Sequence, residues 1–142
     1  MSWLKSMMEK EPPEPENPIG IVVIGNLEGD QAHESAKEMV RKSLKKAQFK
    51  TVNLGKGVPA DVFASKAKEV NADIIAVSIN TSPAKDNLPK LISAIEAEGI
   101  KGKVAIMIGG AAVDKEDADK IGAVYGKTRE EAVALAKKII EK

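Results

Sequence analysis

The chain has 142 residues, 43% of them hydrophobic and 30% charged, which is typical of one folded domain with a sizeable core. Its 22 basic and 21 acidic residues give a net charge of +1, and 3% of the residues are aromatic, so we expect no nucleic-acid partner. The absence of cysteine excludes disulfides and thiolate metal sites and is compatible with the cytoplasmic location that we expect. No apolar run approaches the roughly 18 residues that span a bilayer, so we expect no membrane association either.

The first 18 residues differ in composition from the rest. Apolar residues at helical spacing predict a short helix over Met1–Met8, with Trp3 on its apolar face. Prolines and glutamates alternate over residues 11–18 and predict an extended, hydrated linker. Two interpretations of Met1–Met8 stay open, a docking segment for a partner and a tail that packs on the parent domain. We therefore divide the chain into 1–18 and a domain over 19–142.

From Ile19 onward, short apolar runs alternate with longer amphipathic ones, a pattern typical of βαβ units. The expected strands are 19–24, 49–54, 73–79, 104–108 and 123–125. The expected helices are 30–47, 59–70, 88–98, 114–121 and 128–142, with a loop over 80–87. Five strands and five helices in strict alternation predict an α/β fold with a doubly wound, three-layer, parallel sheet of flavodoxin-like order 2-1-3-4-5.

The first predicted helix has one apolar stripe and one basic side. The stripe that we expect in the core comprises Ala36, Met39, Val40, Leu44 and Ala47. The basic residues that we expect to face water are Arg41, Lys42 and Lys45.

The loops after the strands meet at one edge of such a sheet, where open α/β folds bind ligands. His33, the single histidine of the chain, follows the first strand, and Ser78, Asn80 and Ser82 lie at the end of the third. These side chains are expected to face one ligand where the strand order reverses. Gly109-Gly110 after the fourth strand either lets backbone approach a flat or bulky group or forms a tight turn before a helix.

The motifs of several common enzyme classes are missing. Residues 55–58 lack the Gly-Lys-Ser/Thr ending of a phosphate-binding loop, and residues 25–29 do not match the dinucleotide fingerprint. The third strand ends in Ser78-Ile79-Asn80 where a phospho-receiver needs an aspartate. With one histidine and no cysteine, a metal site here would combine one imidazole with ligands supplied by a cofactor.

Three segments resemble the cobalamin-binding domain of corrinoid methyltransferase proteins. Residues 22–37 resemble the family's strand and Glu-Gly-Asp-x-His-x-x-Gly-Lys loop. Residues 76–79 resemble its Val-Ser-x-Leu strand end. Residues 106–123 resemble its Gly-Gly-Ala-Pro-Val and Ala-Asp-x-Ile-Gly-Ala segments. The matching segments are spread across the predicted domain, which makes the resemblance specific.

The resemblance implies cobalamin or a related corrinoid as cofactor, with His33 as the lower axial cobalt ligand and Ser78 in contact with the buried nucleotide tail. The cofactor-binding residues that it implies are Gly29, Asp30, His33, Ser78, Asn80, Ser82, Gly109, Gly110 and Tyr125. By the same resemblance, the chain passes a methyl group between partner methyltransferase subunits and is not an enzyme by itself. The alternative is a cofactor-free interaction or regulatory module with the same fold.

The first segment departs from the family pattern in its spacing. Two residues separate Asp30 from His33 where the family has one. A carboxylate behind a ligand imidazole fixes the ring and its basicity, and with this spacing its identity stays open among Asp30, Glu28 and Glu34. The helical domain that usually precedes this one has only Met1–Met8 in its place, so the resemblance is to a minimal or divergent corrinoid module or to a relative that has lost the cofactor.

Overall fold

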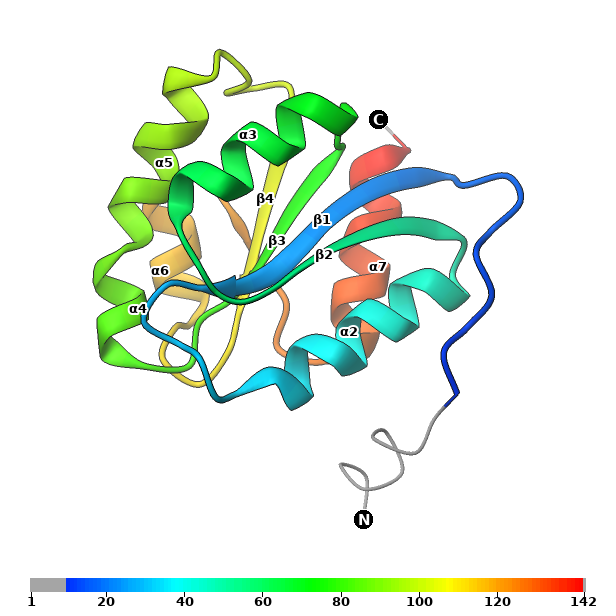
Figure 1. The fold of residues 1–142 in the computed structure, drawn as a ribbon, viewed down its shortest axis with the longest axis horizontal. Helices are drawn as coiled ribbons and strands as arrows, with labels where there is room; N and C mark the ends of the chain where they lie inside the picture. The colour runs from blue at the N-terminus through cyan, green and yellow to red at the C-terminus, as the bar shows by residue number, and fades with distance from the viewer. Residues whose placement is uncertain (1–9, 142) are drawn as a thin grey trace.

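The computed structural model describes residues 10–141, which form one parallel five-stranded sheet of order β2-β1-β3-β4-β5 (Figure 1). The strands are β1 (Gly20–Leu27), β2 (Phe49–Val58), β3 (Ile74–Ser78), β4 (Ala105–Gly109) and β5 (Val124–Tyr125). The helices are α2 (Glu34–Lys46), α3 (Ala60–Val70), α4 (Ser82–Asp86), α5 (Leu88–Ala97), α6 (Lys115–Lys120) and α7 (Arg129–Ile140). The predicted fold class and strand order are confirmed.

Two element boundaries differ from the prediction near the expected site. The predicted loop over 80–87 contains α4, because the Thr81 hydroxyl accepts a hydrogen bond from the Ala84 N–H and caps this short helix. The helix expected from residue 30 or 31 begins at Glu34 instead, with His33 at its N-cap position. Residues 28–33 therefore form a loop rather than a first helical turn.

The N-terminal segment is described only in part. Residues 10–18 contain neither helix nor strand. The helix predicted at Met1–Met8 lies outside the described residues, and the division at residue 18 stays a prediction. Among the described helices, none is long and apolar enough to cross a membrane.

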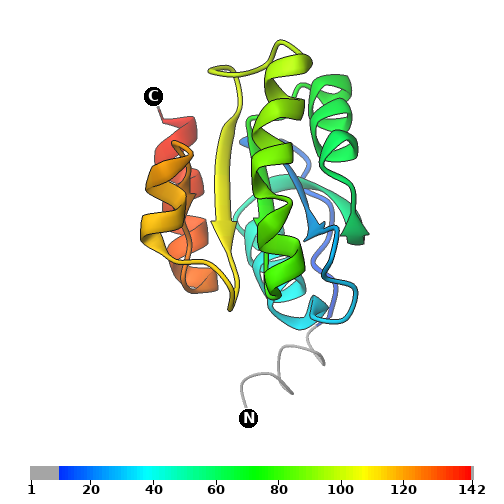
Figure 2. The ribbon, with the colours of Figure 1, turned by 90° about the vertical axis from the view of Figure 1, so that its left-hand side faces the viewer.

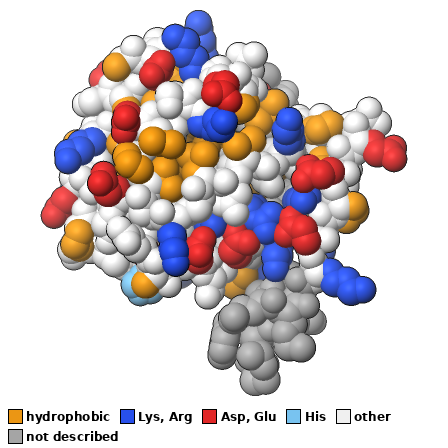
Figure 3. Space-filling view, in the orientation of Figure 1, with side chains coloured by type: hydrophobic (Ala, Val, Ile, Leu, Met, Phe, Trp, Pro, Cys, Tyr) orange, Lys and Arg blue, Asp and Glu red, His pale blue; other side chains and the backbone are white. Residues whose placement is uncertain are grey.

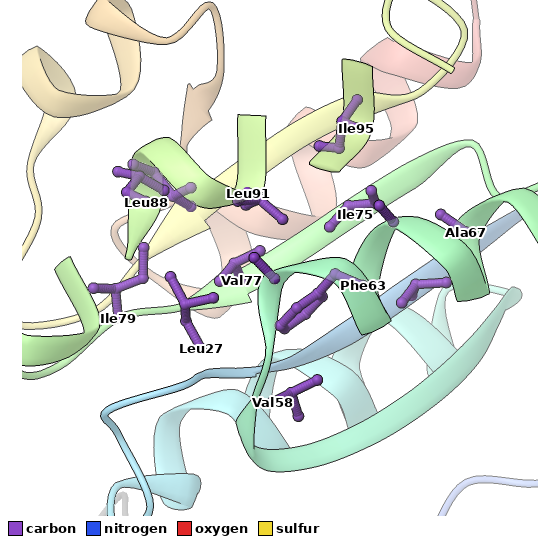
Figure 4. Close-up of a cluster of buried hydrophobic side chains, with 14 of the residues drawn as sticks. Leu27, Val58, Phe63, Ala67, Ile75, Val77, Ile79, Leu88, Leu91 and Ile95 are labelled. Atoms are coloured by element: carbon purple, nitrogen blue, oxygen red, sulfur yellow. The ribbon is translucent and has the colours of Figure 1, made fainter. Parts of the chain in front are cut away.

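One face of the sheet is covered by α3 and α5 and carries the larger core (Figure 4). Phe63 of α3, Ile75 of β3 and Leu91 of α5 are fully buried in it. Figure 2 shows α3 and α5 on one side of β4 and α7 on the other. Because helices cover both faces, the central strands are apolar along most of their length.

The opposite face is covered by α2 and α7 and carries a smaller core. Leu44 of α2 is fully buried there, as predicted. Val40 and Ala47 are half-buried against this core, whereas Ala36 is exposed and Met39 only half-buried. The predicted stripe is therefore core at its C-terminal end and open at its N-terminal end.

The three basic residues of α2 that were expected to face water are not exposed: Arg41 and Lys45 are buried and Lys42 is half-buried. Arg41 and Lys45 are only 9% and 6% exposed because the linker residue Glu11 lies over them. The Glu11 carboxylate accepts hydrogen bonds from Arg41 Nη1 and Nη2 at 2.8 and 2.6 Å and from Lys45 Nζ at 2.7 Å. Glu14 also pairs with Lys45, at 2.9 Å. The hydrogen bonds from Arg41 and Lys45 lower the pKa of Glu11 to about 2.

Candidate functional site

The loop between β1 and α2 is folded tightly against its neighbours. The Asp30 N–H donates to the Leu27 carbonyl at 3.0 Å, and Gly29 has a φ of +104°. A Cβ on Gly29 would lie 2.7 Å from the Ala84 nitrogen, so only glycine lets this loop pass the start of α4. The Thr81 hydroxyl donates to the Gly29 carbonyl at 2.8 Å and ties the two loops together.

Asp30 is the centre of a buried polar cluster and has no exposed surface. Its Oδ2 accepts hydrogen bonds from Asn80 Nδ2 at 2.7 Å and from Asn26 Nδ2 at 3.1 Å. Burial alone would raise the pKa of Asp30, but the hydrogen bonds from Asn80, His33 and Asn26 outweigh it and lower the pKa to about 2. Asp30 is therefore a carboxylate at any physiological pH.

His33 contacts this carboxylate directly. Its Nδ1 lies 2.9 Å from Asp30 Oδ1, while the side chain remains 58% exposed. Figure 3 shows the histidine at the surface of the molecule. The extra residue does not prevent the pair, because residues 31–33 precede the helix and the loop absorbs the insertion. Of the three candidate carboxylates, Asp30 is the partner, whereas Glu34 pairs with Lys37 at 3.1 Å.

The hydrogen bond to Asp30 sets the chemistry of the imidazole. A neutral ring that donates its Nδ1 proton to a carboxylate keeps its lone pair on Nε2. More than half of the His33 side chain is exposed, so the ring lies at the surface of the protein. The Asp30–His33 pair therefore holds an imidazole at the surface in an orientation in which its second nitrogen could act as a metal ligand.

Asn80 connects this cluster to the ends of two further strands. Besides Asp30, its Nδ2 donates to the Ser78 hydroxyl at 3.0 Å. Its Oδ1 accepts a hydrogen bond from the Ala111 N–H at 3.0 Å, in the loop after β4. Asp30 thus joins His33 to Asn80, and Asn80 joins this pair to Ser78.

Asn26 is a cluster member that the sequence interpretation missed. It has no exposed surface, and its Nδ2 donates both to Asp30 and to the His33 carbonyl, the latter at 3.0 Å. Its Oδ1 is buried and finds no hydrogen-bond partner among the described residues. The sequence did contain a signal for this residue, because Asn26 is a polar residue directly after an apolar run. The prediction missed it because it ended the first strand at residue 24, whereas β1 extends to Leu27.

A cavity of about 820 Å³ opens beside this cluster, between α2, α7 and the strands β1, β3 and β4. Ala36, Met39 and Val40 of α2 line it, which explains why this part of the predicted stripe is not packed in the core. Among the predicted site residues, those that line it are Ser78, Asn80, Gly109, Gly110 and Tyr125. Of the remaining predicted residues, Ser82 is exposed at the start of α4 and does not line the cavity.

The Gly109-Gly110 pair is required by the chain's own packing. Gly110 has a φ of +119°, and a Cβ there would overlap the Ile79 carbonyl oxygen. A Cβ on Gly109 would lie 2.7 Å from the Gly126 carbonyl oxygen. Both glycines therefore let backbone segments of the protein meet, and in doing so they form one wall of the cavity.

Lys37 connects α2 to β2 at the edge of the cavity. Its side chain has no exposed surface, and its Nζ donates to Glu34, Glu38 and Asn53 at 3.1, 2.9 and 2.9 Å. Among residues 10–141, no three imidazole or carboxylate side chains come together as a metal site. A metal held by His33 would therefore need further ligands from outside these side chains.

The sequence was compared with known proteins. Residues 20–136 match the family model described as B12 binding domain. The dimethylamine corrinoid protein of Methanosarcina barkeri is 39% identical over 123 residues, which is 86% of this chain and 57% of that protein. The trimethylamine corrinoid protein 1 of Methanosarcina acetivorans is 38% identical over 141 residues, 99% of this chain and 64% of that protein. The chain thus spans about three fifths of the length of these curated relatives.

Solved structures with the same fold include two from cobalamin-related proteins. A cobalamin-binding protein from Desulfitobacterium hafniense superimposes with a TM-score of 0.80 at 26% identity, over 84% of this chain and 58% of that one. A chain of the methanol:cobalamin methyltransferase complex from Methanosarcina barkeri gives a TM-score of 0.81 at 23% identity, over 96% of this chain and 51% of that one. The receiver domain of a response regulator from Mycobacterium tuberculosis reaches 0.59 at 13% identity and shares the fold alone.

Proposed function

Because this chain belongs to the B12-binding domain family, whose cofactor class is cobalamin and related corrinoids, we propose that it is a methyl-carrier module with His33 as the lower axial cobalt ligand. The observation that carries the proposal is the His33–Asp30 pair at 2.9 Å. With Nδ1 bonded to Asp30, a neutral His33 ring keeps Nε2 for a metal, and a neutral imidazole nitrogen is a common metal ligand. When bound, the corrinoid would supply a cobalt centre able to carry a methyl group.

The residues of this edge fit such a cofactor. A preformed cavity of about 820 Å³ is within the usual range for a small-molecule site, and its mouth carries Ser78 and Asn80. Asn80 hydrogen-bonds both Ser78 and Asp30, so one network joins the cavity to the imidazole. An elongated ligand with a metal at one end and a tail at the other would occupy both places. The Oδ1 of Asn26 lies in the same cluster and has no donor among residues 10–141.

Each residue of the cluster has a distinct role in this proposal. Asp30 orients the imidazole and keeps the ring proton on Nδ1, which raises the donor strength of Nε2. Asn26 and Asn80 hold the Asp30 carboxylate in place. The remaining predicted contacts, made by Gly29, Ser82, Gly109, Gly110 and Tyr125, stay part of the proposal.

Methyltransferase subunits are the partners that we propose. The structural match to a chain of a methanol:cobalamin methyltransferase complex supports this choice, and His33 lies on an accessible surface on which a second protein would find the cofactor. Catalysis would then belong largely to the partner. A docking role for Met1–Met8 stays a prediction.

Uptake of hydroxocobalamin tests the proposal. Purified protein is incubated with the corrinoid, desalted and examined by absorption spectroscopy. We expect the wild type to stay coloured, His33→Ala to show an altered spectrum with retention weakened by at least about ten-fold, and Asp30→Asn an intermediate effect. Lys90→Ala, at an exposed position on α5, is the matched control and should equal the wild type.

Two outcomes would count against the proposal. If the folded wild type elutes colourless after exposure to several corrinoids, the carrier function is lost and the cofactor-free module becomes the better interpretation. If the wild type binds but His33→Ala has an identical spectrum, the cofactor is held without this ligand.

A further inference from the structure

The stretch of loop that leads into His33 lies at the surface. Gln31 and Ala32 are exposed, so burial does not fix their conformation. The His33 side chain forms no capping hydrogen bond to α2, and its backbone angles of φ −104° and ψ 60° belong to neither helix nor strand. The direction of the imidazole therefore depends on the segments against which this loop rests.

Residues 80–87, which include α4, bond the first part of the loop (Figure 1). Three of their side chains donate hydrogen bonds to three successive loop residues. The pairs are Asn87 to the Glu28 carbonyl at 2.7 Å, Thr81 to the Gly29 carbonyl at 2.8 Å and Asn80 to the Asp30 carboxylate at 2.7 Å. The two members of each pair are 50–59 residues apart along the chain, so a distant segment serves as a template for the loop.

Asn80 is held in a defined orientation. Its Oδ1 accepts a hydrogen bond from the Ala111 N–H at 3.0 Å, so its amide nitrogen faces the other way. That nitrogen donates to Asp30 Oδ2 and to the Ser78 hydroxyl. The backbone after β4 thus determines which acceptors this amide reaches.

Asn26 approaches the same carboxylate from β1. Its Nδ2 donates to Asp30 Oδ2 at 3.1 Å and to the His33 carbonyl at 3.0 Å. A flipped amide would aim its oxygen at these two acceptors, so the hydrogen bonds determine the orientation. This orientation leaves the buried Oδ1 without a donor among residues 10–141, which is unfavourable. The same orientation ties the Asp30 side chain to the His33 backbone.

The two carboxylate oxygens of Asp30 have different partners. Asn26 and Asn80 both donate to Oδ2. Oδ1 accepts a hydrogen bond from the His33 N–H at 3.3 Å and lies 2.9 Å from His33 Nδ1. Two donors on Oδ2 fix the plane of the carboxylate, and with it the place of the oxygen that the imidazole meets.

We propose that Asn26 and Asn80 are positioning residues that set the direction of the His33 imidazole before any cofactor binds. The inference rests on the proposed function, which gives this ring its task. Both asparagines act through Asp30, and Asn26 acts also through the His33 backbone. A ring that is held in advance loses less conformational freedom when a metal binds, so binding is tighter.

The single histidine of the chain allows a test without a cofactor. Isotope-labelled protein gives one set of imidazole nitrogen signals, and their chemical shifts give the ratio of the two neutral tautomers. In the wild type we expect the Nδ1–H form to exceed the Nε2–H form at least about ten-fold, because its proton is donated to a carboxylate. Asn26→Leu and Asn80→Leu keep the shape without the amide donors and should lower this ratio several-fold. Asn17→Ala, at an exposed asparagine of the linker, is the matched control and should equal the wild type.

Retention of hydroxocobalamin on desalted protein is the second measurement. Asn26→Leu and Asn80→Leu should both retain it several-fold less well than the wild type. Asn80→Ser keeps one donor at this position and should show a smaller change of the same kind in both measurements. It takes the place of Asn80→Leu if that variant does not fold.

Folded variants with the tautomer ratio of the wild type would overturn the inference. An altered ratio with unchanged corrinoid retention would overturn it too, because the direction of the ring would then not matter to the cofactor. If the wild type binds no corrinoid while the variants still change the ratio, the proposed function is lost and the positioning of the ring stands.

Discussion

The two faces of the sheet are built from similar apolar residues but differ in how completely they are packed. Under α3 and α5, side chains such as Phe63 and Leu91 fill the space between the layers and leave no exposed surface (Figure 4). Under α2 and α7, Met39 and Val40 end at a cavity of about 820 Å³. The first face carries the larger cluster of buried apolar residues, and the second carries a cavity that a ligand could fill. An apolar helical stripe therefore does not by itself identify core.

The largest effect on stability is expected on the packed face. Phe63→Ala removes a fully buried ring and leaves a cavity, and we expect it to lower the free energy of unfolding by about 3–5 kcal/mol. Chemical denaturation measures the change. A loss below about 1 kcal/mol would show that this face is not the more tightly packed one.

The polar cluster should have the next largest effect and the clearest pH dependence. Asp30 has an ordinary pKa of 3.8 that the fold lowers to about 2, and this shift contributes about 2 kcal/mol at neutral pH. Since the folded pKa is the lower one, this stability is present above pH 3.8 and is lost as the pH falls towards 2. Asp30→Asn should remove this contribution from the unfolding free energy measured between pH 2 and 7.

Glu11 and Glu38 also have pKa values lowered to about 2, so the wild-type profile alone does not isolate Asp30. Subtracting the stability profile of Asp30→Asn from that of the wild type isolates the contribution of Asp30. Asp86→Asn, at an exposed position of α4, is the matched control. Parallel profiles for wild type and Asp30→Asn would contradict the assignment of Asp30 as the buried carboxylate.

The ion pairs that cover α2 should matter less. Glu11→Gln leaves Arg41 and Lys45 without their shared carboxylate, but Glu11 is 47% exposed and solvent weakens the interaction. We expect a loss of about 0.5–1 kcal/mol that shrinks at high salt. Unfolding at low and high ionic strength measures it, with the exposed Glu16→Gln as control. Equal losses at both salt concentrations would rule out the electrostatic origin.

The smallest change in stability is expected inside the cavity. Met39→Ala enlarges a space that is already open, so the free energy of unfolding should fall by about 0.5 kcal/mol or less, while corrinoid retention weakens. Measuring both quantities on one variant separates the two faces directly. A loss of stability comparable to that of Phe63→Ala would show that this wall is ordinary core.

The fold could be predicted from the sequence because the spacing of apolar residues identifies strands and helices, and their alternation along the chain determines the topology. Apolar runs of strand length alternate with amphipathic helices, and only a few topologies accommodate that order. The same alternation placed Ser78, Asn80 and His33 at one edge of the sheet, where the structure joins them. These residues were predictable because parallel strands bring their carboxyl ends together.

The details that were wrong depend on contacts between distant segments. The burial of Arg41 and Lys45 follows from Glu11, 30 and 34 residues away along the chain. The open end of the α2 stripe follows from the space that α7 leaves beside it. The Asp30–His33 pair, which the sequence left open, follows from a helix start three or four residues later than expected, which spacing alone does not reveal.

The linker contacts on α2 have a mechanical consequence. Glu11 and Glu14 fasten residues 10–18 to the last two turns of the helix that walls the cavity. The described part of the linker therefore lies along α2 before it reaches the start of β1 (Figure 1). The ion pairs thus fix the path that the linker takes along this helix.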